Sequence, residues 1–200
     1  MKPIFLRIVI LVGFAGLFSP VMSGQGMQKL KAFQSQIKTF EAVFHQKVVD
    51  DNKNQLQESS GKVYLLRPNK FRWDHKKPDE QYIVSNGKKI WIYNTEMKEL
   101  SVKKLKGPAS NSLARILSGT QDLSKAFRIL DKGKKNGIWW VELVPKSDKS
   151  SFKAVRLGFT RTLKMIETED QLGHISTFEF TQIKTNPKLQ NALFNFKVPN

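Results

Sequence analysis

Hydrophobic residues at helical spacing open the patterned part of the chain, and strand-like runs follow. Leu30, Phe33 and Ile37 recur at i, i+3 and i+7, which predicts a helix over Met27–Thr39. The later runs are β-branched and aromatic, with a spacing of about ten to twelve residues that is typical of sandwiches and barrels. The expected strands are Phe40–Val48, Leu56–Leu66, the runs that continue to Asn94, Glu99–Leu105, Phe127–Leu130, Ile138–Val144, Phe152–Phe159, Leu163–Glu169, His174–Ile183 and Leu193–Val198.

Short helices are expected to interrupt this series of strands. Gly107-Pro108-Ala109-Ser110 breaks the pattern, Ser112–Leu117 reads as a helix that Gly119 ends, and Asp122–Lys125 reads as a further turn. A last helical turn is expected at Pro187–Ala192. Because short helices gain little stability from propensity alone, they must dock on another element. The sequence contains no internal repeat and no interdomain linker, so one domain is expected.

The stretch Gly61–Asn94 is unusual because its strands are apolar on both faces. Ile90 and Ile92 point to one face, and Trp91 and Tyr93 point to the other. An antiparallel sheet with one wet face should alternate apolar and polar residues. We therefore expect helices of the chain or a ligand to cover the second face.

Sequence motifs in this stretch carry a resemblance to a known family. Arg67-Pro68-Asn69, the pair Phe71-x-Trp73 and Pro78-Asp79-Glu80 are followed by Val84-Ser85-Asn86-Gly87-Lys88 and by Trp91-x-Tyr93-Asn94. In residue types and spacing the chain resembles the LolA family of periplasmic lipoprotein carriers, from its first helix to about Val198. The resemblance implies a mainly β (α+β) fold, in which an unclosed antiparallel β-barrel carries a helical lid over an apolar cavity.

The N-terminus is expected to be a cleaved secretory signal. Lys2 and Arg7 precede an apolar run over Ile8–Phe18, Pro20 breaks it, and Val21-Met22-Ser23 offers small residues for cleavage. The run is too short to span a bilayer, which takes about twenty residues. We expect residues 1–23 to be the signal peptide and residues 24–200 the carrier domain; a retained N-terminal anchor is the alternative.

Composition adds two constraints. The chain has no cysteine, so its stability must come from a core, and no lipid can be attached at the signal junction. Its formal net charge is +17, with basic clusters at Lys103-Lys104-Lys106 and Lys132-Lys134-Lys135. For an exported protein this charge predicts a solvated face or attraction to acidic partners at a membrane surface, and no nucleic acid.

Candidate catalytic and metal sites are poor. His45, His75 and His174 have no metal-ligand spacing, and Asp74 and His75 are adjacent on an expected strand, so their side chains point to opposite faces. No nucleophile elbow, phosphate loop or zincin motif occurs. We therefore expect neither an enzyme nor a cofactor or metal site.

The resemblance instead implies binding of acyl chains in an apolar cavity, for which large or flexible apolar side chains are well suited. The resemblance also assigns roles to single residues. It implies that Arg67 hydrogen-bonds carbonyl groups of the lid and acts as a latch on the empty carrier, and that Phe71 lies at the cavity mouth and takes part in cargo transfer. The expected cavity residues are Phe44, Phe71, Trp73, Ile83, Trp91, Tyr93, Leu113, Ile116, Leu117, Trp140 and Phe178.

The function expected is that of a periplasmic chaperone for lipoproteins. The resemblance implies that it takes acylated lipoproteins from an inner-membrane ABC transporter of the Lol type and delivers them to an outer-membrane receptor, as a monomer. One alternative is a related exported domain that binds lipid or lipopolysaccharide, or that senses envelope stress. Another is a secreted basic β-domain that acts only through protein contacts and needs no cavity.

Overall fold

The computed structural model describes residues 24–104, 113–119 and 122–199, so the expected signal peptide and the break at residues 107–110 lie outside the described residues. The helical elements are α1 (Gln25–Gln36), α2 (Leu113–Ser118) and the 3-10 turns η1 (Leu123–Lys125) and η2 (Asn191–Phe194). The strands are β1 (Thr39–Val49), β2 (Gln55–Leu66), β3 (Lys70–Lys77), β4 (Gln81–Asn86), β5 (Lys89–Asn94), β6 (Glu99–Lys104), β7 (Phe127–Lys135), β8 (Ile138–Pro145), β9 (Phe152–Phe159), β10 (Leu163–Asp170) and β11 (Ile175–Thr185).

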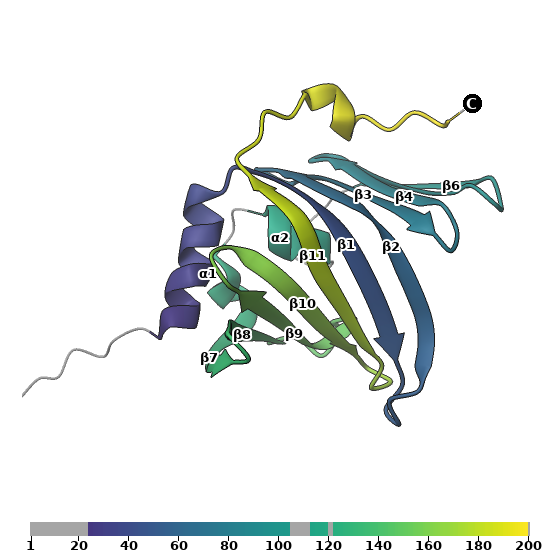
Figure 1. Cartoon of the computed structure of the whole chain (residues 1–200). Coiled ribbons are helices and arrows are strands. Elements are labelled where there is room, and N and C mark those ends of the chain that lie inside the picture. Colours follow the sequence, from purple (N-terminus) through teal and green to yellow (C-terminus); the bar gives the residue numbers. More distant parts are fainter. Residues whose placement is uncertain (1–23, 105–112, 120–121, 200) are drawn as a thin grey trace, which may run out of the picture.

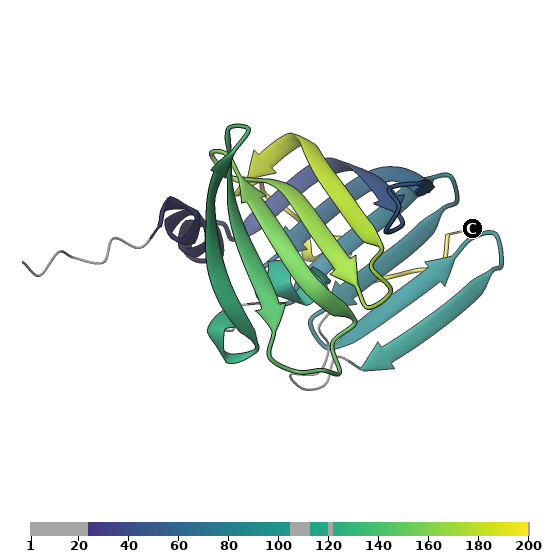
Figure 2. The ribbon, with the colours of Figure 1, turned by 90° about the horizontal axis from the view of Figure 1, so that it is seen from below.

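The eleven described strands form one antiparallel sheet in the order β6-β5-β4-β3-β2-β1-β11-β10-β9-β8-β7. The sheet curves strongly around a concave inner face, and α2 lies inside that curve (Figures 1 and 2). Its two edge strands, β6 and β7, pair with only one neighbour each, so the barrel remains unclosed. The prediction of a mainly β, unclosed antiparallel architecture with few helices is confirmed.

One half of the inner face is filled by the chain's own side chains. Inward residues of β1 and β8–β11 form a core in which Phe44, Val141 and Phe159 are fully buried. Helix α1 covers the end of the sheet near β7–β9. Its residue Phe33 packs edge to face against Phe40, with ring centroids 6.0 Å apart. This half of the sheet therefore contributes a large part of the main hydrophobic core.

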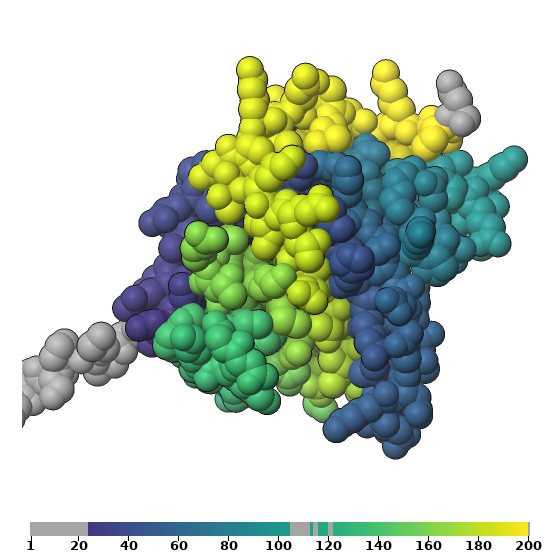
Figure 3. Space-filling model, viewed as in Figure 1, coloured from purple at the N-terminus to yellow at the C-terminus, as the bar shows by residue number. Residues whose placement is uncertain are grey.

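The outer face of β3–β5 is covered by the C-terminal segment, which crosses it in yellow in Figures 1 and 3. Tyr82, Val84 and Tyr93 form a second apolar cluster there, and the ring of Phe196 packs against it, 5.6 Å from that of Tyr93. Phe194, in η2, is fully buried. The two-faced apolar pattern of these strands is thus explained by this cover on one side and by the inner face on the other.

The expected elements at the C-terminus were wrong in detail. The helical turn was expected over Pro187–Ala192 and a strand over Leu193–Val198, but the turn is at Asn191–Phe194 and irregular chain follows it. The side chains of Phe194 and Phe196 pack on the sheet, whereas the backbone of this segment joins no strand. The alternation of apolar residues in this segment therefore reflects side chains that pack on the sheet, not a strand that belongs to it.

Lysines lie along both free edges of the sheet. Lys103 and Lys104 on β6, and Lys132, Lys134 and Lys135 on β7, are all exposed. Edge strands present unpaired backbone groups that can recruit other chains, and exposed lysines are a common protection against such pairing. The described lysines of the two basic clusters thus lie at the edges of the unclosed barrel, where their charge disfavours such pairing.

Gly61 lies where β2 shifts register against β3, as expected for a bulge. A Cβ atom at Gly61 would collide with the backbone oxygen of Asp74 and would lie 3.0 Å from a ring carbon of Phe44. Because neither the strand backbone nor the packed ring can retreat easily, a larger residue would separate β2 from β3.

We predict that Gly61→Ala lowers the free energy of unfolding by about 3 kcal/mol, the upper range for overpacking a core. Chemical denaturation monitored by circular dichroism measures this change. Ser60→Ala is the control, because it changes the neighbouring position without adding an atom. Equal stabilities of the two variants would show that the close approach at Gly61 is not constraining.

Candidate functional site

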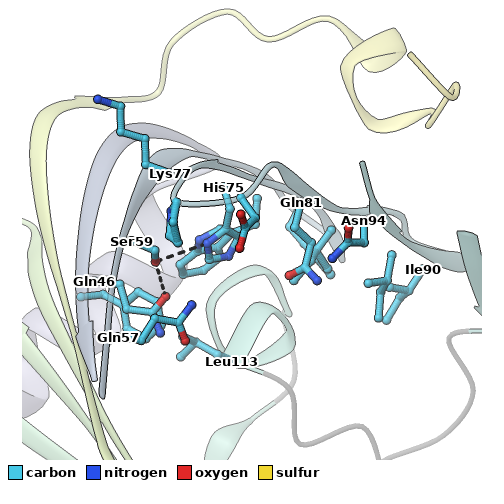
Figure 4. Close-up of a pocket in the computed structure, with 16 residues that line it drawn as sticks. Gln46, Gln57, Ser59, His75, Lys77, Gln81, Ile90, Asn94 and Leu113 are labelled. Carbon is cyan, nitrogen blue, oxygen red and sulfur yellow. Dashed lines mark hydrogen bonds between the residues drawn. The ribbon is translucent and has the colours of Figure 1, made fainter. Parts of the chain in front are cut away.

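A cavity of 580 Å³ opens on the inner face where the sheet is not filled by its own side chains. Strands β1–β5 and β11 and helix α2 supply its wall (Figure 4). Its volume falls in the range of about 300–1,000 Å³ that is usual for small-molecule sites. The apolar part of the wall is formed by Phe71, Trp73, Ile83, Ile90, Ile92, Leu113 and Phe178.

Five of the expected cavity residues line this space: Phe71, Trp73, Ile83, Leu113 and Phe178. Trp73 and Ile83 are cross-strand partners, and the indole of Trp73 lies 5.3 Å from the ring of Phe178. These residues form a continuous apolar surface on the concave side.

Three others lie in the core rather than in the cavity lining. Phe44 is fully buried between Trp73 and Phe178, with ring centroids 5.3 and 6.2 Å away. Ile116 and Leu117 are residues of α2 itself, and their side chains are buried as parts of the main core. The contacts of Ile116 and Leu117 attach the lid helix to the sheet, and so these residues support the cavity from behind.

The expected positions of Trp91, Tyr93 and Trp140 differ from the structure, which places them on the outer face of the sheet. Trp91 and Tyr93 are the partners of Val84 and Tyr82, and all four belong to the cluster under the C-terminal segment. Trp140 is the partner of Gly158, and its ring lies 3.0 Å from where a Cβ of that glycine would be.

The reason for these errors is register, which aromatic character does not reveal. Cross-strand partners share a face. Ile83 faces inward and pairs with Ile92, so Ile90 and Ile92, not Trp91 and Tyr93, face the cavity. On β8 the alternation of faces turns Trp139, the partner of Phe159, toward the core. The sequence analysis did not single out this residue. The signal for the register of β4 and β5 was the short turn at Gly87 between them, because the length of a hairpin turn fixes which residues of the two strands are partners.

Helix α2 acts as a lid over the inner face. Leu113 contributes to the cavity wall, whereas Ile116 and Leu117 pack against the core. The helix has only six described residues, and such a length is not stable by itself. Its position must therefore be maintained by contacts with the sheet and by bonds to its ends.

The main polar contact at the end of α2 is the guanidinium group of Arg67, which follows β2. Its Nε donates to the carbonyl oxygen of Ile37, just beyond α1, at 2.9 Å, and its Nη1 donates to that of Gly119, just beyond α2, at 2.8 Å. The same group lies 5.1 Å from the ring centre of Phe33. Helix C-termini have unpaired carbonyls and partial negative charge, which suit a buried guanidinium.

A backbone bond reinforces this arrangement. The amide N–H of Asn69 donates to the carbonyl of Ser118, the last residue of α2, at 2.9 Å. We call the three bonds from Arg67 and Asn69 to Ile37, Ser118 and Gly119 the lid latch. Burial lowers the pKa of Arg67 to about 10, so the group remains protonated at neutral pH.

Acid–base groups in the cavity are few. His75 lines it, while Asp74 points to the outer face and pairs with Arg72 at 2.9 Å. His45 is exposed, and His174 contacts Asp170 at 3.0 Å. Within residues 24–104, 113–119 and 122–199, no group of three potential ligands is arranged to hold a metal ion. The helices of this part of the chain also include none that is long and apolar enough to cross a bilayer.

A curved, unclosed sheet with a latched helix over an apolar cavity defines a class of hydrophobic-ligand carriers. The family model described as outer membrane lipoprotein carrier protein LolA matches residues 35–197. The chain belongs to this family.

Curated relatives with the same description cover most of the chain. The outer-membrane lipoprotein carrier protein of Nitrosospira multiformis is 38% identical over 185 residues, which is 92% of this chain and 89% of that protein. The protein of the same name from Methylobacillus flagellatus is 37% identical over 175 residues, or 87% and 85% of the two chains.

A solved structure supports the fold at much lower identity. A putative outer membrane lipoprotein-sorting protein domain from Vibrio parahaemolyticus is similar with a TM-score of 0.51 and 12% identity, covering 86% of this chain and 95% of that one. The shared feature is the sheet architecture alone.

His75 gives a prediction about pH. Burial lowers its pKa, so the folded protein disfavours the imidazolium that the unfolded chain forms near pH 6.5. As the pH falls through that value, the unfolded state takes up a proton that the folded state resists, and stability decreases. We expect His75→Gln to reduce the loss of unfolding free energy between pH 7.5 and about 5.5.

The control is His45→Gln, since His45 is exposed on β1, which is separated from β3 by β2. Denaturant titrations at each pH give the free energies. If the wild type and His75→Gln lose the same stability over this range, the buried imidazole does not determine the pH dependence.

Proposed function

We propose that this protein is a periplasmic chaperone that carries the acyl chains of lipoproteins from the inner to the outer membrane. The observation that carries the proposal is the 580 Å³ cavity beneath a six-residue helix whose end is bound by the lid latch. The names of the homologues agree with this role.

The energetics of lipid anchors explain why such a carrier is needed. Burying each methylene of an acyl chain is worth about 0.8 kcal/mol, so a lipoprotein with several chains does not leave a membrane unaided at a useful rate. A carrier must offer comparable apolar surface and still release its cargo. The wall that includes Trp73, Ile83 and Phe178 supplies such a surface.

The lid latch provides the means of release. Hydrogen bonds to a charged donor contribute about 1.5–3 kcal/mol each. If bound acyl chains displace α2, the bonds from Arg67 to Gly119 and from Asn69 to Ser118 are broken, and this cost lowers the affinity for cargo. The empty, closed state is therefore favoured after transfer to a receptor.

The proposed partners are acylated lipoproteins, an inner-membrane ABC transporter of the Lol type and an outer-membrane receptor. In this role the chain acts in the periplasm as a monomer and does not act as an enzyme. A domain that binds lipopolysaccharide or senses envelope stress is the alternative, and the descriptions of the relatives do not favour it. A domain that acts by protein contact alone would not need the cavity.

The test is release of lipoproteins from spheroplasts that are synthesising them. We expect the protein to bring lipoproteins into solution as one-to-one complexes, measured by size-exclusion chromatography of the medium. We expect Arg67→Leu to form these complexes but to pass cargo to outer membranes at least about tenfold less completely, because loss of even one such bond corresponds to about that factor.

Arg128→Leu is the matched control, since Arg128 is exposed on the edge strand β7 and takes no part in the lid latch. It should behave as the wild type in loading and in transfer. Failure of the wild type to release any lipoprotein would refute the carrier role. Normal transfer by Arg67→Leu would refute the latch while leaving the cavity intact.

A further inference from the structure

A row of polar side chains crosses one end of the cavity wall. Gln46 of β1 is the cross-strand partner of Ser59 of β2, His75 of β3 is the partner of Gln81 of β4, and Gln81 is the partner of Asn94 of β5. We call these five residues the polar row. All five line the cavity, and Figure 4 shows them in succession across its wall.

The polar row is linked by hydrogen bonds at its centre. The hydroxyl of Ser59, which is only 4% exposed, donates to the side-chain oxygen of Gln46 at 2.9 Å and lies 3.5 Å from Nδ1 of His75 (Figure 4). The neighbouring rows of the same strands are apolar, with Trp73, Ile83 and Ile92 as successive partners. The cavity thus has an apolar body and a polar end.

The unused hydrogen-bonding groups beside this end include several donors. The oxygen of Gln46 accepts from Ser59, and that of Asn94 accepts from the amide of Met97, which leaves the NH₂ group of each amide without a partner in the described residues. The indole N–H of Trp73, a donor only, is buried and also lacks an acceptor there. A buried donor without a partner destabilises the empty protein.

Spare donors select a ligand that offers acceptors. Ester carbonyl groups accept hydrogen bonds and donate none, and they lie at the end of an acyl chain. A free carboxylate is a poorer match, because the charged residues of the cavity wall are Lys77 and Asp79, both exposed, whose charges offset each other.

We propose that the polar row binds the ester carbonyls of a glycerol diester while the acyl chains lie along Trp73, Ile83 and Ile92. Gln46, Gln81 and Asn94 are specificity-determining residues in this arrangement, and Trp73, with its unpaired N–H, belongs to the same cavity wall. The inference rests on the proposed function and adds the chemical class of the group that the carrier recognises.

The experiment compares two probes that differ only in the ester carbonyls: dioctanoylglycerol and the corresponding dioctylglycerol diether. Each competes with a hydrophobic fluorescent dye for the full-length mature chain. The wild type should bind the diester roughly three- to tenfold more tightly, as one or two net hydrogen bonds imply. Gln81→Met, which loses no internal side-chain hydrogen bond, should reduce this ratio, and Gln46→Met/Gln81→Met should reduce it further.

Ile83→Ala is the control from the same strand, and it should weaken both probes while leaving their ratio unchanged. Circular dichroism establishes that each variant is folded. Equal binding of the two probes to the wild type would overturn the inference and leave the carrier function standing. A diester preference that is undiminished in the double variant would also overturn it, whereas binding of neither probe would contradict the carrier function itself.

Discussion

The guanidinium group of Arg67 is the interaction on which the arrangement of this protein depends. It bonds to carbonyls beyond the C-terminal ends of both α1 and α2, at 2.9 and 2.8 Å, and so connects the helix that closes one end of the barrel to the helix that covers its cavity. Side-chain contacts with the sheet and the Asn69 bond to Ser118 also contribute to the position of the six-residue helix. Hydrogen bonds from a charged donor are stronger than those between neutral groups, so these contacts stabilise the observed position of α2, and a charged donor can be separated from neutral carbonyls at moderate cost.

The two halves of the sheet differ in what covers their inner and outer faces, and this difference supports the arrangement. Around β8–β11 the inner face is filled with the chain's own rings and aliphatic groups, and this core fixes the position of α1. Around β2–β5 the inner face is left open, and the outer face is covered by the C-terminal segment with Phe194 and Phe196. The open half can therefore present apolar strands to a ligand because their other side is already protected. Exposed lysines on β6 and β7 disfavour pairing of other chains with the two free edges of the unclosed barrel.

Much of the architecture could be predicted from the sequence, because strand periodicity and the motifs around Arg67 and Trp73 are local. The antiparallel unclosed sheet and the family are confirmed. Face assignment was less successful, because it depends on register. Trp91 and Tyr93 were expected in the cavity, but their partners Val84 and Tyr82 place them outside. The C-terminal strand was wrong because a segment that packs its side chains on a sheet has the same apolar pattern as one that joins it.

The polar residues of the cavity illustrate a further limit. Gln46, Ser59 and Gln81 are far apart in sequence and ordinary in type, so no motif identifies them. They become one feature only when the strands align them across the sheet. Arg67, by contrast, was expected to bond the lid, and the carbonyls of Ile37 and Gly119 are its partners.

The most direct test of the account is amide hydrogen exchange at the lid, measured for Asn69 and for Leu113–Ser118 in the empty protein and in the protein loaded with a long-chain lipid. Asn69 donates its N–H to Ser118 only while the lid is closed in the observed position. The account predicts that loading displaces α2 and speeds exchange at these amides, and that empty Arg67→Leu exchanges them as quickly as the loaded wild type. Unchanged or slower exchange on loading, with the Asn69 amide still protected, would show that lipid binds without opening the lid and would contradict the account.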